Sequence, residues 1–390
     1  MQPLTQTQIS SRLLSLDFMR GFIMVLLALE SAGLYENLDD LTKGSLINPA
    51  FQQFFHHPWN GLRFWDLIQP GFMFIAGTAM AYSLTKQFKS GATWSQVFKK
   101  VLKRSWWLFF WGVLDYAVEK DGSLSFELWD VLTQLSFTTL VAFLVFNWSY
   151  RNQVLFCIFL LLLTEALYRF TNIPGFDQPF TDQHNFGNYM DLLLMNQINK
   201  GGWVAINCIP TAVHTIAGAM AGKLIIEQVA GGRLQVPEKM VRHATGNLQP
   251  ASGNLQPATC NLILAAWGIV SLIAGYALDF AGITPIIKRI ATSSFTLASL
   301  GWCLLALAFV YWWIDVLDHK KYLKLFTIVG MNSLFIYVFF EIVGNRWFNG
   351  YVASVTNGLM KMVGTPESLM MIITSLSIFA LEWGMCYFLY

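Results

Sequence analysis

The stretch FFHHPWNGLRFWDLIQP, residues 54–70, gathers groups that can do proton-transfer chemistry. It holds the adjacent histidines His56 and His57, a Trp-Asn-Gly sequence and the carboxylate of Asp66. An unperturbed histidine pKa of about 6.5 leaves a neutral imidazole that accepts a proton at pH 7. A positioned base accelerates a reaction by roughly 10²–10⁴-fold. We therefore predict that one of these histidines is a general base whose tautomer is fixed by Asp66 or Glu30.

Two other interpretations of the histidine pair stay open at this point. The pair could simply be solvated at a membrane edge. It could also bind a metal, but no third or fourth ligand lies at a recognisable spacing. The five cysteines all fall in or beside apolar runs and show no CxxC spacing. We predict no metal site.

The composition is that of an integral membrane protein. Of the 390 residues, 55% are hydrophobic and 12% are charged, whereas soluble domains carry roughly 25% charged residues. The net charge of +2 is too small to suggest a nucleic-acid partner. The expected partners are therefore the lipid bilayer and a small ligand.

The hydrophobic segments predict the fold class. A membrane-spanning helix needs about 20 mostly apolar residues, and such segments lie near 16–35, 63–84, 105–119, 129–147, 152–171, 203–226, 260–281, 293–314, 323–344 and 367–389. We predict an all-α, polytopic membrane helix bundle of about ten transmembrane helices, forming a single domain over residues 1–390. Residues 230–259 contain GNLQPA twice and are rich in Gly, Pro and Asn, so we predict a flexible cytoplasmic loop there.

Positive charge orients the bundle. The loops after the second, sixth and eighth predicted helices are rich in lysine and arginine: Lys86, Lys89, Lys99, Lys100, Lys103 and Arg104 in the first, Lys223, Arg233, Lys239 and Arg242 in the second, and Lys320, Lys321 and Lys324 in the third. Such loops face the cytoplasm. Both termini are then cytoplasmic, and the histidine pair lies on the outer side.

Polar residues gather in the outer half of the predicted bundle. A charge at the centre of a membrane helix costs about 2.5–3.5 kcal/mol, so each one needs a partner, a water-filled cavity or a function. The outer set is Glu30, His56, His57, Asn60, Asp66, Asp115, Glu165, Asp191, Lys288, Glu341 and Arg346. We predict an outward-opening polar cavity suited to a polyhydroxylated ligand such as a sugar.

Tryptophans accompany this polar set. Trp59, Trp65, Trp203 and Trp347 could stack on sugar rings. They are equally what the aromatic belt at a membrane interface contains.

At the cytoplasmic end, Asp17 and Arg20 lie three residues apart on one helix face. They predict either an internal ion pair or an anion site in which Arg20 meets phosphate.

Several motifs occur together in one order along the chain. They are SLDFMRGFIMVLLALES, HHPWNGLRFWDLIQPGFMFIAGTAM, GNYMDLLL, IPTAVHTIAGAMAGKLI, PIIKRIATSSFTL and GMNSLFIYV. In this order they resemble the heparan-alpha-glucosaminide N-acetyltransferase family and its bacterial relatives, from about residue 12 to 345. The resemblance places the protein in a bacterial inner membrane.

The resemblance implies an activity. Members take acetyl from cytoplasmic acetyl-CoA and deliver it across the bilayer to an amino sugar. Their active histidine lies three residues before the Trp of Trp-Asn-Gly, which is His56 here, with His57 one position away. The family's asparagine in the first span corresponds to Ser31, so Glu30 beside it is expected to orient the histidine or bind the acceptor.

The expected roles follow from this comparison. Arg20 with Asp17, Lys223 or the basic second loop would hold the phosphates of acetyl-CoA, and Asn60 or Ser31 would stabilise an oxyanion. The expected acceptor-binding residues are Ser31, Trp59, Asp66, Asp191, Lys288, Glu341 and Arg346.

Other functions remain open from the sequence. Carboxylates in a polar outward cavity also suit a proton-coupled sugar transporter, although no paired halves or matched broken helices are visible. A membrane protein that binds a glycan without turning it over is a further alternative. The apolar faces are also compatible with a homodimer.

Overall fold

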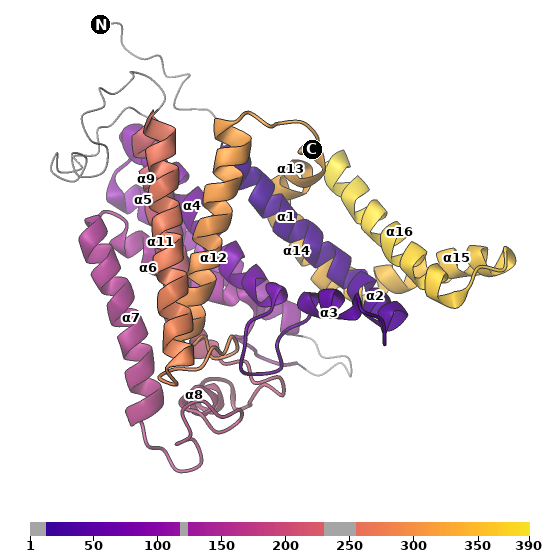
Figure 1. Cartoon of the computed structure of the whole chain (residues 1–390), viewed down its shortest axis with the longest axis horizontal. Helices are drawn as coiled ribbons and strands as arrows, with labels where there is room; N and C mark the ends of the chain where they lie inside the picture. The colour runs from indigo at the N-terminus through magenta and orange to yellow at the C-terminus, as the bar shows by residue number, and fades with distance from the viewer. Residues whose placement is uncertain (1–12, 118–123, 230–254) are drawn as a thin grey trace, which may run out of the picture.

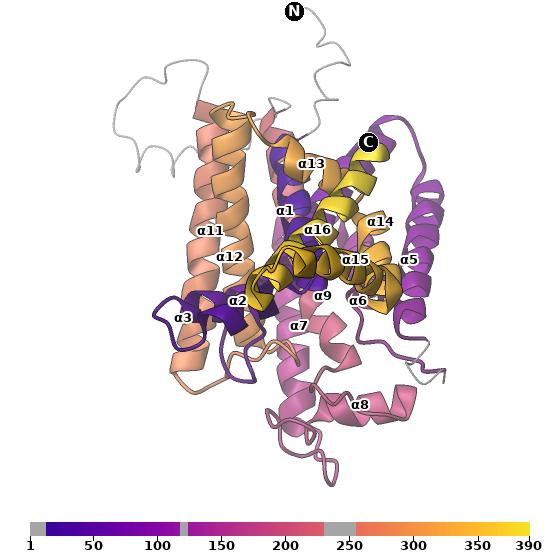
Figure 2. The same cartoon turned by 90° about the vertical axis from the view of Figure 1, so that its right-hand side faces the viewer.

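The computed structural model describes residues 13–117, 124–229 and 255–390. Within these ranges every regular element is a helix and there is no β-strand. The predicted all-α fold is therefore confirmed. Figures 1 and 2 show a bundle whose long helices run from one end to the other, with α15 and α16 projecting from one side.

The fold combines long helices with short ones. The long ones are α1 (Leu14–Ser31), α4 (Ile68–Lys89), α5 (Trp94–Tyr116), α6 (Val131–Val145), α7 (Tyr150–Phe170), α9 (Cys208–Val229), α11 (Leu255–Phe280), α12 (Ser293–Tyr311), α15 (Asn349–Met362) and α16 (Glu367–Phe388). The shorter ones are α2 (Leu34–Thr42), α3 (Asn48–Phe51), η2 (Gln52–Phe54), η3 (Phe64–Leu67), α8 (Phe186–Met195), η4 (Ala205–Asn207), η5 (Trp312–Val316), α13 (Lys324–Met331), α14 (Ser333–Val338) and η6 (Phe339–Phe348).

The described residues contain six to eight candidate membrane spans, whereas the sequence predicts about ten. In the described part of the chain, six helices are long and apolar enough to cross a bilayer: η3 with α4, α7, η4 with α9, α11, α12 with η5, and α16. Two bent pairs, α1 with α2 at 66° and α13 with the helix after it at 77°, raise the number to as many as eight.

The remaining predicted spans fall on α5 and α6. Helix α5 has 23 residues but carries Lys99, Lys100, Lys103 and Arg104 in its first half, and α6 has 15 residues. A helix of 15 residues is about 22 Å long, shorter than the hydrocarbon core of about 30 Å. The figure of about ten spans stays a prediction.

The start of α1 and the end of α16 lie at the same end of the bundle, together with α13 (Figure 1). The opposite end carries α3 and α8 (Figure 2). We call these the basic end and the histidine end, because they hold the basic residues of α5 and the His56 loop. Their assignment to cytoplasm and outside remains a prediction.

Helix α9 packs closely along α4. A Cβ at Gly218 would collide with the carbonyl group of Phe74, and a Cβ at Gly77 with that of Thr215. Small residues allow membrane helices to approach backbone to backbone in this way. The close packing fixes α4, one face of which lines the site described below.

The predicted loop 230–259 is described only in part. Residues 230–254 lie outside the described residues, and α11 begins at Leu255. The final residues of the predicted loop, 255–259, are therefore helical rather than flexible.

Candidate active site

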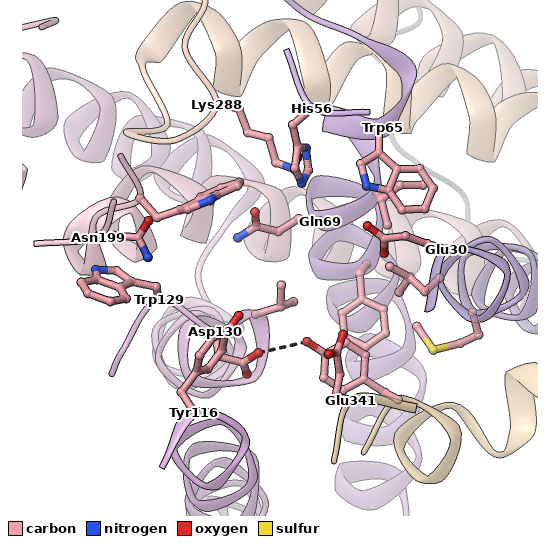
Figure 3. Close-up of a pocket in the computed structure, with 17 residues that line it drawn as sticks. Glu30, His56, Trp65, Gln69, Tyr116, Trp129, Asp130, Asn199, Lys288 and Glu341 are labelled. Atoms are coloured by element: carbon pink, nitrogen blue, oxygen red, sulfur yellow. Dashed lines mark hydrogen bonds between the residues drawn. The ribbon is translucent and has the colours of Figure 1, made fainter. Parts of the chain in front are cut away.

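A cavity of about 250 Å³ opens at the histidine end of the bundle. We call it the histidine pocket. Its polar lining residues are Glu30, His56, Gln69, Tyr116, Asp130, Asn199, Lys288, Tyr337 and Glu341, and its walls include Trp65, Trp129 and Trp203 (Figure 3). Side chains far apart in the sequence therefore meet around one small space.

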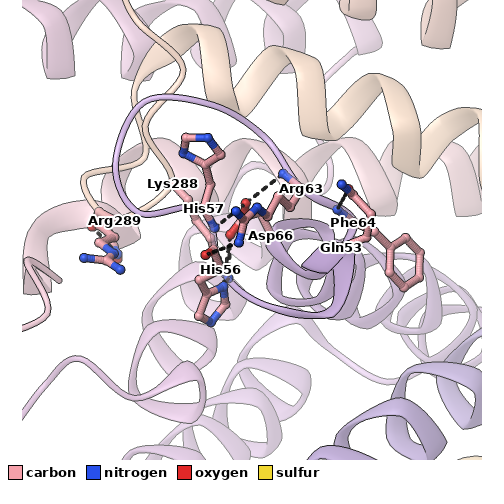
Figure 4. Close-up of polar contacts among 9 residues, drawn as sticks. Gln53, His56, His57, Arg63, Phe64, Asp66, Lys288 and Arg289 are labelled. Carbon is pink, nitrogen blue, oxygen red and sulfur yellow. Dashed lines mark hydrogen bonds and ion pairs between the residues drawn. The ribbon is translucent and has the colours of Figure 1, made fainter. Parts of the chain in front are cut away.

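His56 is held by the start of the next helix. It lies in the loop between η2 and η3, and its Nδ1 is 3.0 Å from Oδ1 of Asp66. The other oxygen of Asp66 accepts hydrogen bonds from the backbone N–H groups of Arg63 and His57, at 2.9 and 3.2 Å. Asp66 is 1% exposed, so it lies behind His56 and orients the ring from outside the pocket (Figure 4).

Lys288 approaches the same imidazole nitrogen. Its Nζ is 3.1 Å from Nδ1 of His56 and 3.9 Å from Oδ1 of Asp66. Its ammonium also lies 5.0 Å from the centre of the Trp203 ring, a cation–π contact. This lysine comes from the loop before α12, so a residue 232 positions along the chain completes the site.

Burial and charge set the protonation of this pair. Burial and the nearby positive charge of Lys288 lower the pKa of His56 to about 4, although Asp66 opposes the shift. Burial lowers the pKa of Lys288 to about 8. At neutral pH the imidazole is therefore uncharged and most of the lysine is protonated.

Asp66 and Lys288 both contact Nδ1 of His56, and in either tautomer only one of the two contacts is a hydrogen bond, because an ammonium only donates. When Nδ1 is protonated toward Asp66, Lys288 interacts with the ring through its charge alone. A carboxylate only accepts hydrogen bonds, so the 3.0 Å contact with Asp66 is a hydrogen bond when Nδ1 carries the proton. In that tautomer Nε2 has an unshared electron pair. This is the arrangement of a general base or a nucleophile oriented by a carboxylate.

The neighbouring histidine is turned away from the pocket. Figure 4 shows the rings of His56 and His57 on opposite sides of the chain. The His57 ring packs against Gly61, where a Cβ would lie 2.6 Å from its Nε2. Gly61 also has a φ of 141°, a conformation that favours glycine. The loop geometry thus separates two histidines that the sequence leaves nearly equivalent.

Carboxylates lie across the pocket from His56 (Figure 3). Glu30 comes from the end of α1, Glu341 from η6, and Asp130 precedes α6. Asp130 caps α6 by accepting from the backbone N–H of Leu132 at 2.6 Å, and it accepts from the hydroxyl of Tyr337 at 3.0 Å. The pocket therefore has carboxyl groups on one wall and an imidazole with an ammonium on the other.

A second cavity of about 650 Å³ lies beside the first, toward the basic end. We call it the basic pocket. Its cations are Arg20, Lys100, Lys103 and Arg104, and most of the remaining lining is apolar, including Trp107, Trp111 and Leu135. Phe72 and Tyr337 line both cavities, so the two pockets adjoin at these rings.

A family model matches more than half of the chain. The profile of the family described as "Heparan-alpha-glucosaminide N-acetyltransferase, catalytic" matches residues 12–249. The chain belongs to this family. The match includes Glu30, His56, Asp66 and the basic residues of α5, whereas Lys288 lies beyond its end.

A curated relative points the same way. The heparan-alpha-glucosaminide N-acetyltransferase of Mus musculus is 30% identical over 113 residues, which are 29% of this chain and 15% of the relative. The chain thus spans a small part of that protein's length. As a family member with apolar membrane helices, this protein is an integral membrane protein of a transferase family.

Some predicted site residues lie outside the pocket of this family member. Asn60 and Arg346 are exposed and do not line it, and Arg346 donates to the carbonyl of Asp115 at 3.0 Å. Ser31 does not line it either, and its hydroxyl donates to Oδ1 of Asn345 at 3.0 Å. We do not retain direct roles for these three residues.

Two further predicted residues, Trp59 and Asp191, lie outside the pocket lining. The indole N–H of Trp59 donates to the carbonyl of Phe180 at 2.8 Å. Asp191 is 0% exposed and accepts from Trp129 Nε1 at 3.1 Å and from the backbone N–H of Ala205 at 2.9 Å. Asp191 therefore holds Trp129, which lines the pocket, from behind. Burial raises the pKa of Asp191 to about 7.

Of the residues predicted to bind phosphate, only some line the basic pocket. Arg20 lines the basic pocket. Lys223 lines neither pocket: its ammonium donates to the carbonyl of Phe146 at 2.9 Å and to Gln153 Oε1 at 3.1 Å. Asp17 is buried and lines neither pocket. We retain Arg20 as a candidate ligand and not Lys223 or Asp17.

Sequence reasoning missed part of the lining. Gln69, Trp129, Asn199 and Tyr337 were not singled out, because such residues also occur as ordinary packing and interface residues. For Gln69 a signal was available: it is a polar side chain just inside a membrane helix, where an amide needs a partner. Trp347, considered as a stacking residue, is 61% exposed and lines neither pocket.

Proposed function

We propose that this protein transfers an acetyl group from acetyl-CoA in the basic pocket to the amine of an amino sugar in the histidine pocket. The observation that carries the proposal is the adjacency of the two cavities. One has four cations, the other has an oriented imidazole, and Phe72 and Tyr337 line both. In this proposal the basic end faces the cytoplasm of a bacterium and the histidine end faces outward.

The basic pocket suits the donor. Arginine and lysine bind phosphate through charge-assisted hydrogen bonds, and Arg20, Lys100, Lys103 and Arg104 supply such groups. The apolar walls beyond them suit the uncharged pantetheine arm. Acetyl-CoA would therefore keep its phosphates at the basic end and direct its thioester toward Phe72.

The histidine pocket suits an amino-sugar acceptor. Glu30 and Glu341 provide acceptors for hydroxyl and ammonium groups, while Asn199 provides an amide. The ring of Trp65 also lines the pocket. The relative's name specifies a glucosaminide, and an amine-bearing sugar agrees with the carboxylates of this pocket.

The chemistry needs an unprotonated Nε2 on His56. The amine nitrogen attacks the thioester carbonyl, a C–N bond forms, the C–S bond breaks, and CoA leaves as a thiolate. The nitrogen gives up a proton, which Nε2 accepts and passes to the sulfur. In a two-step route Nε2 attacks the thioester first and CoA leaves as a thiolate; the amine then takes the acetyl group from Nε2, and the proton that it releases goes to the thiolate. Both routes require the neutral imidazole that the lowered pKa of His56 provides.

The test uses purified protein, radiolabelled acetyl-CoA and glucosamine. The wild-type protein is expected to transfer the label to the sugar. His56→Ala is expected to lose at least 100-fold in rate, following the usual contribution of a general base, while still binding CoA. His57→Ala is the matched control, because that ring faces away from the pocket (Figure 4).

Two results would contradict the proposal. One is normal transfer by His56→Ala. The other is uptake of the sugar into liposomes without CoA, together with no transfer of label, which would favour a carrier. Binding of glucosamine with no transfer by the wild-type protein would favour a glycan-binding protein without turnover.

A further inference from the structure

One face of α4 lines both pockets. Gln69 and Phe72 line the histidine pocket, and Phe72, Ala76 and Ala79 line the basic pocket. Their spacing of three or four residues puts them on one stripe of the helix. From Gln69 to Ala79 the stripe covers about 15 Å along the bundle. The two cavities are therefore successive sections of one path.

The other walls of the path are continuous as well. Helices α1, α5, α6 and α14 with η6 each contribute residues to both pockets. On the last of these, Leu334 lines the basic pocket, Tyr337 lines both and Glu341 lines the histidine pocket. The same helices thus enclose the path on both sides of the point where the two pockets meet, which we call the junction.

At the junction, the lining residues of α4 and those of α14 each include an aromatic ring. On α4, Ala79 and Ala76 leave space in the basic pocket, and Phe72 is the next residue of the lining stripe. On α14 the opposing ring is Tyr337, which is 7% exposed and donates its hydroxyl to Asp130 at 3.0 Å. Asp130 is itself fixed as the cap of α6. One ring of the junction is therefore anchored.

We propose that Phe72 and Tyr337 select the donor by the length of its acyl chain. This inference rests on the proposed function. The thioester must reach the junction for its carbonyl carbon to meet the histidine pocket. An acetyl group adds one methyl group beyond that carbon, whereas a butyryl group adds two more methylenes that must lie between the rings or in a pocket of about 250 Å³ that also holds the acceptor.

The size of the effect follows from known pocket discrimination. One methylene in a snug apolar pocket changes kcat/KM by roughly 10–200-fold. Wild-type protein is therefore expected to prefer acetyl-CoA over propionyl-CoA, and propionyl-CoA over butyryl-CoA. Truncating Phe72 removes one wall of the junction and opens room for the two extra methylenes.

The experiment measures kcat/KM with acetyl-CoA, propionyl-CoA and butyryl-CoA, with glucosamine as acceptor. Phe72→Ala is expected to reduce the preference for acetyl over butyryl by about 10-fold or more, through a gain with butyryl-CoA. Phe110→Ala is the matched control, since Phe110 also lies on a wall helix but lines neither pocket. Tyr337→Phe keeps the ring, loses its anchor and is expected to relax the preference less.

The outcomes separate this inference from the proposed function. If wild-type protein transfers acetyl and Phe72→Ala keeps the wild-type preference, the junction does not select chain length and the inference is overturned. Phe72→Leu, a smaller change, decides the question in the same way if the alanine variant does not fold. If wild-type protein transfers no acyl group at all, the proposed function fails first.

Discussion

Asp66 holds both the imidazole of His56 and the loop that carries this histidine. One carboxylate oxygen lies 3.0 Å from Nδ1 of His56, and the other accepts from the backbone N–H of Arg63 at 2.9 Å and of His57 at 3.2 Å. Two of these three contacts are to backbone, so the carboxylate cannot turn without breaking the start of η3. The position of the imidazole is therefore set by the entry of the chain into α4.

Asp66→Asn is expected to abolish most transfer without unfolding the loop. The amide oxygen can still accept from the two backbone N–H groups, but its NH₂ then faces Nδ1 of His56. Nδ1 must accept, so the proton moves to Nε2 and the base is lost. We expect a rate loss of about 10²–10⁴-fold, with unchanged CoA binding and melting temperature. Transfer at the wild-type rate would show that the tautomer of His56 is unimportant.

Lys288→Met is expected to raise the pKa of His56. The positive charge of Lys288 lowers that pKa, so its removal makes protonation easier and shifts the change from neutral to charged imidazole to higher pH. Modification of His56 by diethyl pyrocarbonate, followed by peptide mass spectrometry, reports the neutral fraction. At pH 5.5 the wild-type His56 should react, whereas the variant should react much less.

Lys43→Met is the control for this measurement. Lys43 is exposed and pairs with Asp40 rather than with His56. Its replacement should leave the pH profile of His56 modification unchanged. If Lys288→Met and wild-type protein give the same profile, the 3.1 Å approach of Lys288 has no electrostatic effect on the imidazole.

Lys100→Met is expected to weaken CoA binding, whereas Lys99→Met is not. Lys100 lines the basic pocket, and its sequence neighbour Lys99 lines neither pocket. A hydrogen bond to a charged group contributes about 1.5–3 kcal/mol, which is about a 10–100-fold change in Kd. Isothermal titration with CoA measures the change, and pantetheine, which lacks the nucleotide, should bind both variants alike. Equal loss in both lysine variants would contradict a specific phosphate site.

Asp191→Ala is expected to destabilise the protein and raise KM with a smaller effect on kcat. The change leaves the N–H groups of Trp129 and Ala205 without their buried acceptor, at a cost of about 1–3 kcal/mol. Trp129 lines the histidine pocket, so its release affects acceptor binding. Thermal unfolding and steady-state kinetics measure the two effects. A large fall in kcat with unchanged stability would instead indicate direct participation of Asp191.

The same residue predicts a pH dependence of stability. Burial raises the pKa of Asp191 from 3.8 to about 7 in the folded protein. A raised carboxyl pKa means that the folded state binds the proton more tightly. Its contribution to stability is then full below about pH 4 and is lost as the pH rises through 7. Asp191→Asn should therefore show a smaller drop in melting temperature between pH 5 and pH 8 than wild-type protein.

The sequence predicts how far along a helix a polar residue lies better than it predicts which way its side chain faces. His56, Glu30, Lys288 and Glu341 stand out because lipid does not tolerate such groups without a purpose, and all four line the histidine pocket. Hydropathy and spacing fix how far along a helix a residue lies. They do not fix which way it faces once neighbouring helices pack.

Because the sequence does not fix which way a side chain faces, some predicted residues lie outside the pockets. Asn60 and Arg346 lie at the histidine end of the bundle, as expected, but do not line the pocket. Lys223 contacts Phe146 and Gln153 instead of a pocket. Conversely, Phe72 and Tyr337 have the composition of ordinary packing residues, so only the joining of α4 and α14 around two cavities reveals them. The predicted spans on α5 and α6 are not among the candidate spans of the described residues, because α5 carries four basic residues in its first half and α6 has 15 residues.

The most direct test of the account follows acetyl across a bilayer. Proteoliposomes are loaded with glucosamine, washed, and given radiolabelled acetyl-CoA outside. The account predicts labelled N-acetylglucosamine inside vesicles with wild-type protein, and none with His56→Ala. Labelled product that forms only when both substrates are on the same side of the bilayer would contradict transfer between the two pockets.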